Sequence, residues 1–76
     1  MKKRLIQERI GDAIRAQRKA AEYSQEDFAD RIGMSRAYYG VLERGGKDFR
    51  ASTIERICTG LRNSMWELIR DAESLR

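Results

Sequence analysis

The stretch that decides the fold is YSQEDFADRIGMSRAYYGVLERG, residues 23–45. It contains two helix starts separated by a glycine. Ser24 can cap the first helix, with Asp27 completing a capping box, and Ser35 can cap the second. Gly33, which lies between them, is suited to the left-handed conformation that ends a helix. The pattern therefore predicts two short helices joined by a tight turn.

Two adjacent tyrosines indicate the register of the second of these helices. Neighbouring residues project about 100° apart on a helix, so Tyr38 and Tyr39 cannot share a face. Met34, which precedes the cap, is spaced to pack against Tyr39 as a hydrophobic staple. With Ser35 as the cap, Tyr39 and Leu42 face the core. The residues expected on or beside the opposite face are Arg36, Ala37, Tyr38 and Val41.

Apolar residues recur at helical spacing along the rest of the chain, which contains no proline. We expect a first helix from about Lys3 to about Ala21. The patterns STIE and SMWE, which open with Ser52 and Ser64, predict the starts of a fourth and a fifth helix. The sequence thus predicts an all-α, five-helix fold in a single domain, residues 1–76. Outside the helix that contains Tyr38 and Tyr39, the side chains expected to face the core are Ile6, Ile10, Ala13, Ile14, Gln17, Phe28, Ala29, Ile32, Ile54, Ile57, Cys58, Leu61, Met65, Leu68, Ile69 and Ala72.

Composition narrows the class of protein. Among 76 residues, 16 Lys and Arg against 12 Asp and Glu give a formal net charge of +4, which favours a polyanionic partner. One cysteine cannot form an intramolecular disulfide, and the absence of histidine removes the usual zinc ligand and the commonest general base. We therefore expect no metal, no cofactor and no enzymatic activity. No apolar run is long enough for a signal peptide or a membrane span, which favours a cytoplasmic location.

On spacing alone, residues 23–45 could equally form an ordinary helical hairpin. Their detailed pattern resembles the helix-turn-helix domains of the Cro and phage-repressor class, and the resemblance extends to IGDAIRAQRKA, STIERICTGL and SMWEL. It implies a lambda-repressor-like domain in which helices 2 and 3 form the helix-turn-helix. The chain departs from the class at Glu22 and Phe49, where glycine and proline are frequent. The matching residues are Ser24, Gln25, Phe28, Ala29, Gly33, Ser35, Leu42, Glu43, Arg44 and Gly45.

The resemblance implies which residues contact DNA. Gln25 matches a position that hydrogen-bonds a DNA phosphate, and no packing task is evident for it. Arg36 is the first choice for reading a guanine through O6 and N7, with discrimination of about 1–3 kcal/mol. Arg44 and Lys47 match a loop that approaches phosphates or the minor groove. The positions that face the major groove are Ser35, Arg36, Ala37, Tyr38 and Val41.

The resemblance also implies one structural contact. Glu43 of the recognition helix should form a partly buried ion pair with Arg18 of the first helix. The pair would lock the recognition helix to the rest of the domain.

A single small domain offers few base contacts, so we expect a two-fold homodimer on a palindromic operator, with half-sites roughly 34 Å apart. Trp66 is the candidate for the interface because it lies near the outer edge of the fifth helix, together with Ile69 and Leu75. The alternative is that Trp66 caps the core.

These features predict a sequence-specific DNA-binding transcriptional regulator with no ligand domain. Because the chain ends soon after the fifth helix, its size favours a restriction–modification controller protein or a small phage repressor, either of which can regulate its own gene. An alternative is an antitoxin-type module that neutralises a protein partner and represses its own operon. A membrane-surface role is disfavoured because the core accounts for the apolar stripes.

Overall fold

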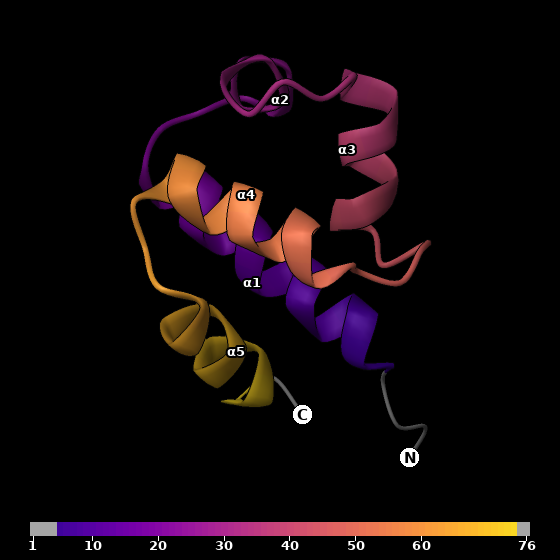
Figure 1. The fold of residues 1–76 in the computed structure, drawn as a ribbon, viewed down its shortest axis with the longest axis vertical. Coiled ribbons are helices and arrows are strands. Elements are labelled where there is room, and N and C mark those ends of the chain that lie inside the picture. The colour runs from indigo at the N-terminus through magenta and orange to yellow at the C-terminus, as the bar shows by residue number, and fades with distance from the viewer. Residues whose placement is uncertain (1–4, 75–76) are drawn as a thin grey trace.

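Five helices make up residues 5–74, the part of the chain that the computed structural model describes. They are α1 (Ile6–Ala20), α2 (Gln25–Arg31), α3 (Arg36–Glu43), α4 (Ala51–Leu61) and α5 (Met65–Ser74). No strand occurs within these residues, so the all-α prediction is confirmed (Figure 1). None of the described helices is long and apolar enough to cross a membrane.

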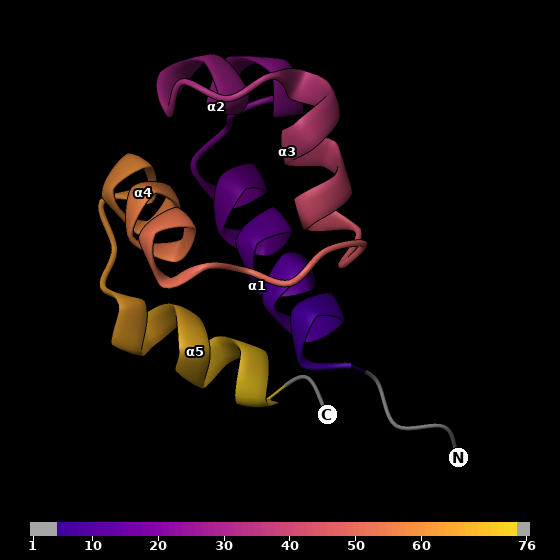
Figure 2. The same cartoon turned by 45° about the vertical axis from the view of Figure 1, so that its right-hand side comes forward.

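α1 is the centre of the arrangement. α3, α4 and α5 all pack against it, while α2 packs against α3, and α4 against α5. Figure 2 shows α1 between α3 on one side and α4 with α5 on the other, with α2 across the C-terminal end of α1. α3 therefore lies at an outer edge of the molecule, supported from behind by the longest helix.

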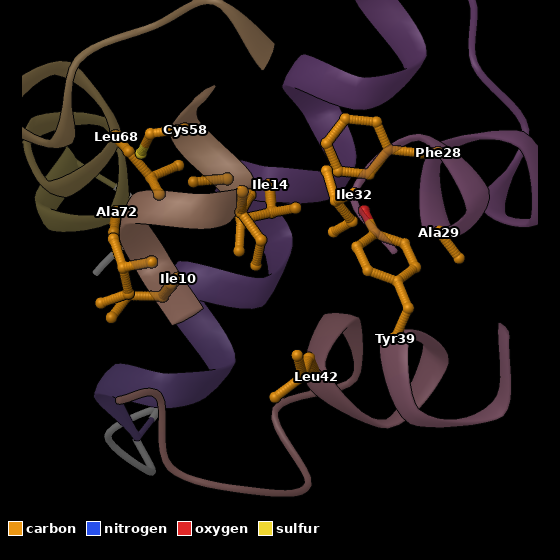
Figure 3. Packing of buried hydrophobic residues seen from close by; sticks show 13 residues of the cluster. Ile10, Ile14, Phe28, Ala29, Ile32, Tyr39, Leu42, Cys58, Leu68 and Ala72 are labelled. Atoms are coloured by element: carbon orange, nitrogen blue, oxygen red, sulfur yellow. The ribbon is translucent and has the colours of Figure 1, made fainter. Parts of the chain in front are cut away.

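The core is built from apolar side chains of all five helices. The Phe28 ring packs between two tyrosines, with its centroid 5.4 Å from that of Tyr39 and 5.6 Å from that of Tyr23. Figure 3 shows Phe28 and Tyr39 beside Ile32, where α2 and α3 meet the core. The buried hydrophobic residues, all of which were predicted from helical spacing, are Ile10, Ala13, Ile14, Phe28, Ala29, Ile32, Tyr39, Leu42, Ile54, Ile57, Cys58, Leu68 and Ala72.

Serine caps begin three of the helices, as predicted. Each hydroxyl accepts a hydrogen bond from the backbone N–H three residues later, at 3.0 Å for Ser24 and 3.1 Å for Ser35 and Ser64. These bonds satisfy N–H groups that have no partner within the first helical turn. The hydrogen bonds to Ser24 and Ser35 set the starts of α2 and α3.

The start of α4 differs from the prediction. The helix begins at Ala51, after Arg50 in an extended conformation that lacks a side-chain cap. Ser52 therefore lies within the first turn, and its predicted role as the N-cap is wrong. Phe49, immediately before, packs against the core. This tertiary contact fixes where the chain enters the helix and overrides the local capping pattern.

Two apolar residues at helix starts are more exposed than predicted. Among the described residues α1 begins at Ile6, after Leu5 in an extended conformation, and the predicted start near Lys3 lies outside them. Ile6 is 45% exposed, and Met65 at the start of α5 is 39% exposed. Both were expected to face the core, but each projects from the first turn of its helix, where neighbouring helices no longer cover it. Gln17, Leu61 and Ile69, which were also expected to face the core, are half-buried.

Left-handed residues occur in the turns on both sides of α2. Gly33 has a φ of 71°, as its place after α2 predicted. Glu22, where the resembled class often has glycine, has a φ of 65°. This conformation costs a residue with a side chain roughly 1–2 kcal/mol. The Tyr23 N–H donates to the Arg18 carbonyl at 3.1 Å across the turn, so the turn closes despite the substitution.

Candidate nucleic-acid interface

α2, the turn after it and α3 form one unit at an end of the molecule. Within the turn, the Gly33 N–H donates to the Asp30 carbonyl at 3.1 Å, and the Met34 N–H donates to the Ala29 carbonyl at 2.9 Å. α3 then leaves at a steep angle to α2 along the outer edge (Figures 1 and 2). In a helix-turn-helix, a second helix presented in this way enters the DNA major groove.

The outward face of α3 carries polar and apolar groups side by side. Arg36 and Ala37 are exposed, Tyr38 keeps 40% of its surface exposed, and Val41 is half-buried. Ser35 is exposed at the helix start, where its hydroxyl accepts the Tyr38 N–H. The face therefore offers a guanidinium, a phenol and apolar methyl groups, which suit guanine edges, phosphates and thymine methyls respectively.

Two further cations lie at the C-terminal end of this face. Arg44, which follows the last residue of α3, is exposed. Lys47 is also exposed, and its Nζ lies 5.8 Å from the centroid of the Tyr38 ring, within cation–π distance. The loop after α3 thus folds back beside the outward face, and the structure brings Lys47 and Tyr38 together.

Gln25 has an internal partner that the sequence did not indicate. Its Nε2 donates a hydrogen bond to the Oε1 atom of Glu43 at 3.0 Å, and its side chain is half-buried. The expectation that Gln25 has no packing task is therefore wrong. An amide nitrogen carries two N–H donors, so the second N–H remains for another acceptor. The two residues lie far apart along the chain, and no local pattern connects them.

Glu43 is the centre of a buried polar network. Its carboxylate accepts from the Arg18 guanidinium in bidentate fashion, Nε to Oε2 at 2.5 Å and Nη2 to Oε1 at 3.2 Å, so the structure contains this ion pair. The Tyr39 hydroxyl donates to Oε2 at 2.5 Å. Arg15, which was not predicted, lies 3.5 Å from Oε1 through its Nε. Its place three residues before Arg18, on the same side of α1, was the available signal.

The network fixes the charge states of its members. Burial is the largest influence on the Glu43 carboxyl and would raise its pKa. Hydrogen bonds from Arg18, Tyr39 and Gln25 outweigh burial, and the pKa lies below the ordinary 4.5. The hydrogen bond to Glu43 raises the pKa of Arg18 further, and burial raises the pKa of Tyr39 well above 10. At neutral pH, a charged pair and a neutral phenol therefore hold α3 against α1.

Two of the residues expected at a dimer interface, Trp66 and Ile69, lie on α5, away from this face. Trp66 is 72% exposed, the largest exposure among the large hydrophobic residues described, so it does not cap the core. Ile69 is half-buried and packs against the core. Leu75 lies outside the described residues.

Residues 5–74 contain no cluster of acidic or cysteine side chains able to hold a metal ion. A shallow depression lies between the starts of α2 and α3, and it is lined by Arg18, Ser24, Gln25, Glu26, Asp27 and Arg36. It joins the outward face of α3 to the buried network.

The fold and this face together define a helix-turn-helix protein of the Cro and phage-repressor class. A family model described as helix-turn-helix matches residues 14–65. The control protein C.MunI of Mycoplasma sp is 35% identical over 69 residues, which is 90% of this chain and 93% of C.MunI. The chain belongs to this helix-turn-helix family, and it is a DNA-binding transcriptional regulator.

Solved structures show the same fold. The clp gene regulator ClgR from C. glutamicum superimposes with a TM-score of 0.92 at 25% identity, over 96% of this chain and 95% of ClgR. The restriction-modification controller protein C.AhdI from Aeromonas hydrophila has a TM-score of 0.78 at 32% identity, over 82% of this chain and 94% of C.AhdI.

Proposed function

We propose that the protein is a sequence-specific regulator that binds a palindromic operator as a homodimer and controls its own gene, in the manner of a restriction–modification controller. The observation that carries the proposal is the outward face of α3. It presents Arg36, Tyr38 and apolar methyl groups on a helix held from behind by the Glu43 network. This rigidity favours base reading, because contacts to base edges require fixed geometry.

In this proposal, positioning and reading are divided between residues. Gln25, Arg44 and Lys47 contact phosphates and set the register on the duplex, without reading sequence. Arg36 donates two hydrogen bonds to a guanine. Ala37 and Val41 contact thymine methyl groups, Tyr38 contacts a phosphate, a sugar or a thymine methyl, and Ser35 lies at the groove edge.

The controller assignment rests on the relatives. C.MunI is a control protein and aligns with nearly all of this chain, and C.AhdI is a restriction-modification controller protein with the same fold. A regulator of this kind acts in the cytoplasm on its own promoter. A dimer places two copies of α3 on successive turns of one DNA face, about 34 Å apart. The exposed Trp66 on α5 provides an apolar surface for that dimer.

Footprinting of the full-length protein on the DNA upstream of its own gene tests the proposal. We expect a protected, two-fold symmetric site and, in a reporter assay, a change in expression when the protein is supplied. No protection on this DNA, combined with tight binding to the product of a neighbouring gene, would instead support the antitoxin-type alternative.

A further inference from the structure

Gln17 is a polar residue on the face of α1 that packs toward the core. Its side chain is half-buried, and both ends of its amide form a hydrogen bond. Nε2 donates to the Oδ2 atom of Asp71 in α5 at 2.8 Å, and Oε1 accepts from the Nδ2 atom of Asn63 at 2.8 Å. An ionised carboxylate can only accept, so the amide nitrogen must face Asp71. One amide therefore joins α1 both to α5 and to the loop before it.

Asn63 carries this contact into the start of α5. Its Oδ1 atom accepts the Ser64 N–H at 3.0 Å, and Ser64 is the residue that caps α5. Trp66, two residues after that cap, is 72% exposed. The Gln17 amide thus holds α5 at its start through Asn63 and nearer its C-terminal end through Asp71. Two attachment points along one helix fix its direction as well as its position.

α1 links this contact to the recognition helix. Arg18, the residue after Gln17, forms the buried ion pair with Glu43 at the end of α3. Adjacent residues of α1 therefore hold α5 and α3, the helices proposed to contact the partner protomer and the DNA. In a two-fold dimer joined through α5, the distance between the two copies of α3 depends on the angle between α5 and α1. Hydrogen bonds restrict such an angle more than apolar packing does, because they are directional and the hydrophobic effect is not.

We infer that Gln17, Asn63 and Asp71 set the spacing between half-sites that the dimer accepts. The inference rests on the proposed function, since it requires a dimer that joins through α5 and binds a palindromic operator. Gln17 is a positioning residue, which acts on the operator through the orientation of α5. One base pair more or less between the half-sites moves them about 3.4 Å and rotates one against the other by about 35°. A dimer whose α5 is held by these hydrogen bonds should reject operators changed in this way.

Operators whose spacer is one base pair longer or shorter test the inference. The wild type should bind them at least about tenfold more weakly than the footprinted operator. Gln17→Leu removes both hydrogen bonds and keeps a side chain of similar size, so circular dichroism and sedimentation should show a folded dimer. Its spacer preference should largely disappear, a change of about tenfold, which one or two hydrogen bonds can supply. Gln7→Leu makes the same change at a half-buried glutamine ten residues earlier on α1, and this control should keep the wild-type preference.

Exchanging the donor and the acceptor gives a second test that needs no apolar substitution. Gln17→Glu places a carboxylate beside that of Asp71, and the repulsion should weaken the spacer preference as Gln17→Leu does. Adding Asp71→Asn restores the pairing, because the carboxylate at position 17 can accept from Asn63 and from the amide at position 71. This double variant has the net charge of the wild type, and it should recover the wild-type spacer preference.

The outcomes separate the inference from the proposed function. A dimeric Gln17→Leu variant that keeps the wild-type spacer preference would overturn the inference alone. A dimeric wild type that binds all spacers equally would do the same, and so would a double variant that fails to recover the preference. If Gln17→Leu does not fold, the double variant decides. A wild type that binds no duplex, or binds only as a monomer, would overturn the proposed function together with the inference.

Discussion

Arg18 and Glu43 form a bidentate ion pair in which the carboxylate has no exposed surface and the arginine side chain is 7% exposed. The pair joins α1 to the last residue of the recognition helix. A third donor from Arg18, Nη1, binds the Tyr23 carbonyl at 2.6 Å, so the same guanidinium also fixes the turn that leads into α2. One side chain therefore positions both helices of the helix-turn-helix.

Removing Arg18 should destabilise the domain strongly. Arg18→Met leaves the Glu43 carboxylate buried without its main partner, at a cost of about 3–5 kcal/mol in the free energy of unfolding. Urea denaturation measures the difference. Arg15→Met is the matched control, because Arg15 is 41% exposed and lies 3.5 Å from the carboxylate. The control should lose less than about 1 kcal/mol. Equal losses in the two variants would contradict the assignment of Arg18 as the main partner.

The pKa of Glu43 predicts how stability depends on pH. It lies below the ordinary 4.5 in the folded protein, because the hydrogen bonds from Arg18, Tyr39 and Gln25 outweigh the effect of burial. The unfolded chain therefore takes up this proton first as the pH falls. The stabilisation is present above about pH 4.5 and is lost as the pH falls through the folded-state value.

Glu43→Gln should consequently be less stable than the wild type at pH 7. Its free energy of unfolding should fall less than that of the wild type as the pH is lowered. Denaturation of the wild type and the variant at pH 7 and pH 3 measures both differences. We expect the gap between them to be smaller at pH 3. A gap of the same size at both values would show that ionisation of Glu43 does not contribute.

Gly11 should tolerate no side chain. A Cβ atom there would lie 2.9 Å from the Leu42 carbonyl oxygen and would clash with the Glu43 carbonyl oxygen, since α1 and the end of α3 touch through their backbones. Gly11→Ala should lower stability by about 1–3 kcal/mol despite its better helix propensity. Gly40→Ala is the control, because the atom nearest to a Cβ at position 40 belongs to the flexible side chain of Arg44 and not to the backbone. Thermal unfolding should separate the two variants in opposite directions, and a stabilised Gly11→Ala would show that the helices can move apart.

Local signals in the sequence predicted most of the fold. The caps at Ser24, Ser35 and Ser64 and the left-handed Gly33 depend on neighbours within a few residues, so the sequence carries them directly. Buried residues within helices were predicted for the same reason. The start of α4 was not, because the contact of Phe49 with the core, rather than a cap, decides it.

The candidate site was predictable in its composition and less so in its contacts. Helical spacing separated the exposed Tyr38 from the buried Tyr39. The hydrogen bond from Gln25 to Glu43 joins different helices. Such contacts depend on how two helices cross, which their separate sequences do not specify.

Arg36 and Gln25 should differ in how they affect DNA binding. Arg36→Ala should remove about 1–3 kcal/mol of discrimination at one guanine position, whereas Gln25→Ala should weaken all sites evenly. Titration of both variants against a panel of single-base operator variants measures this. If Arg36→Ala keeps the wild-type preference at every position, Arg36 does not read a base.

Trp66 should be required for the dimer rather than for the fold. It is 72% exposed, whereas Leu68 and Ala72 of the same helix are fully buried, so Trp66→Glu should keep the helical content. The variant should shift toward monomer, because a charge then occupies an apolar contact between protomers. Operator affinity should fall most at low protein concentration, where dimerisation no longer brings the two half-site readers together before binding. Base preference within a half-site should persist.

Sedimentation and operator titration of the same sample measure both effects, with Arg70→Ala as the control on the same helix. A Trp66→Glu variant that stays dimeric and binds normally would remove Trp66 from the interface.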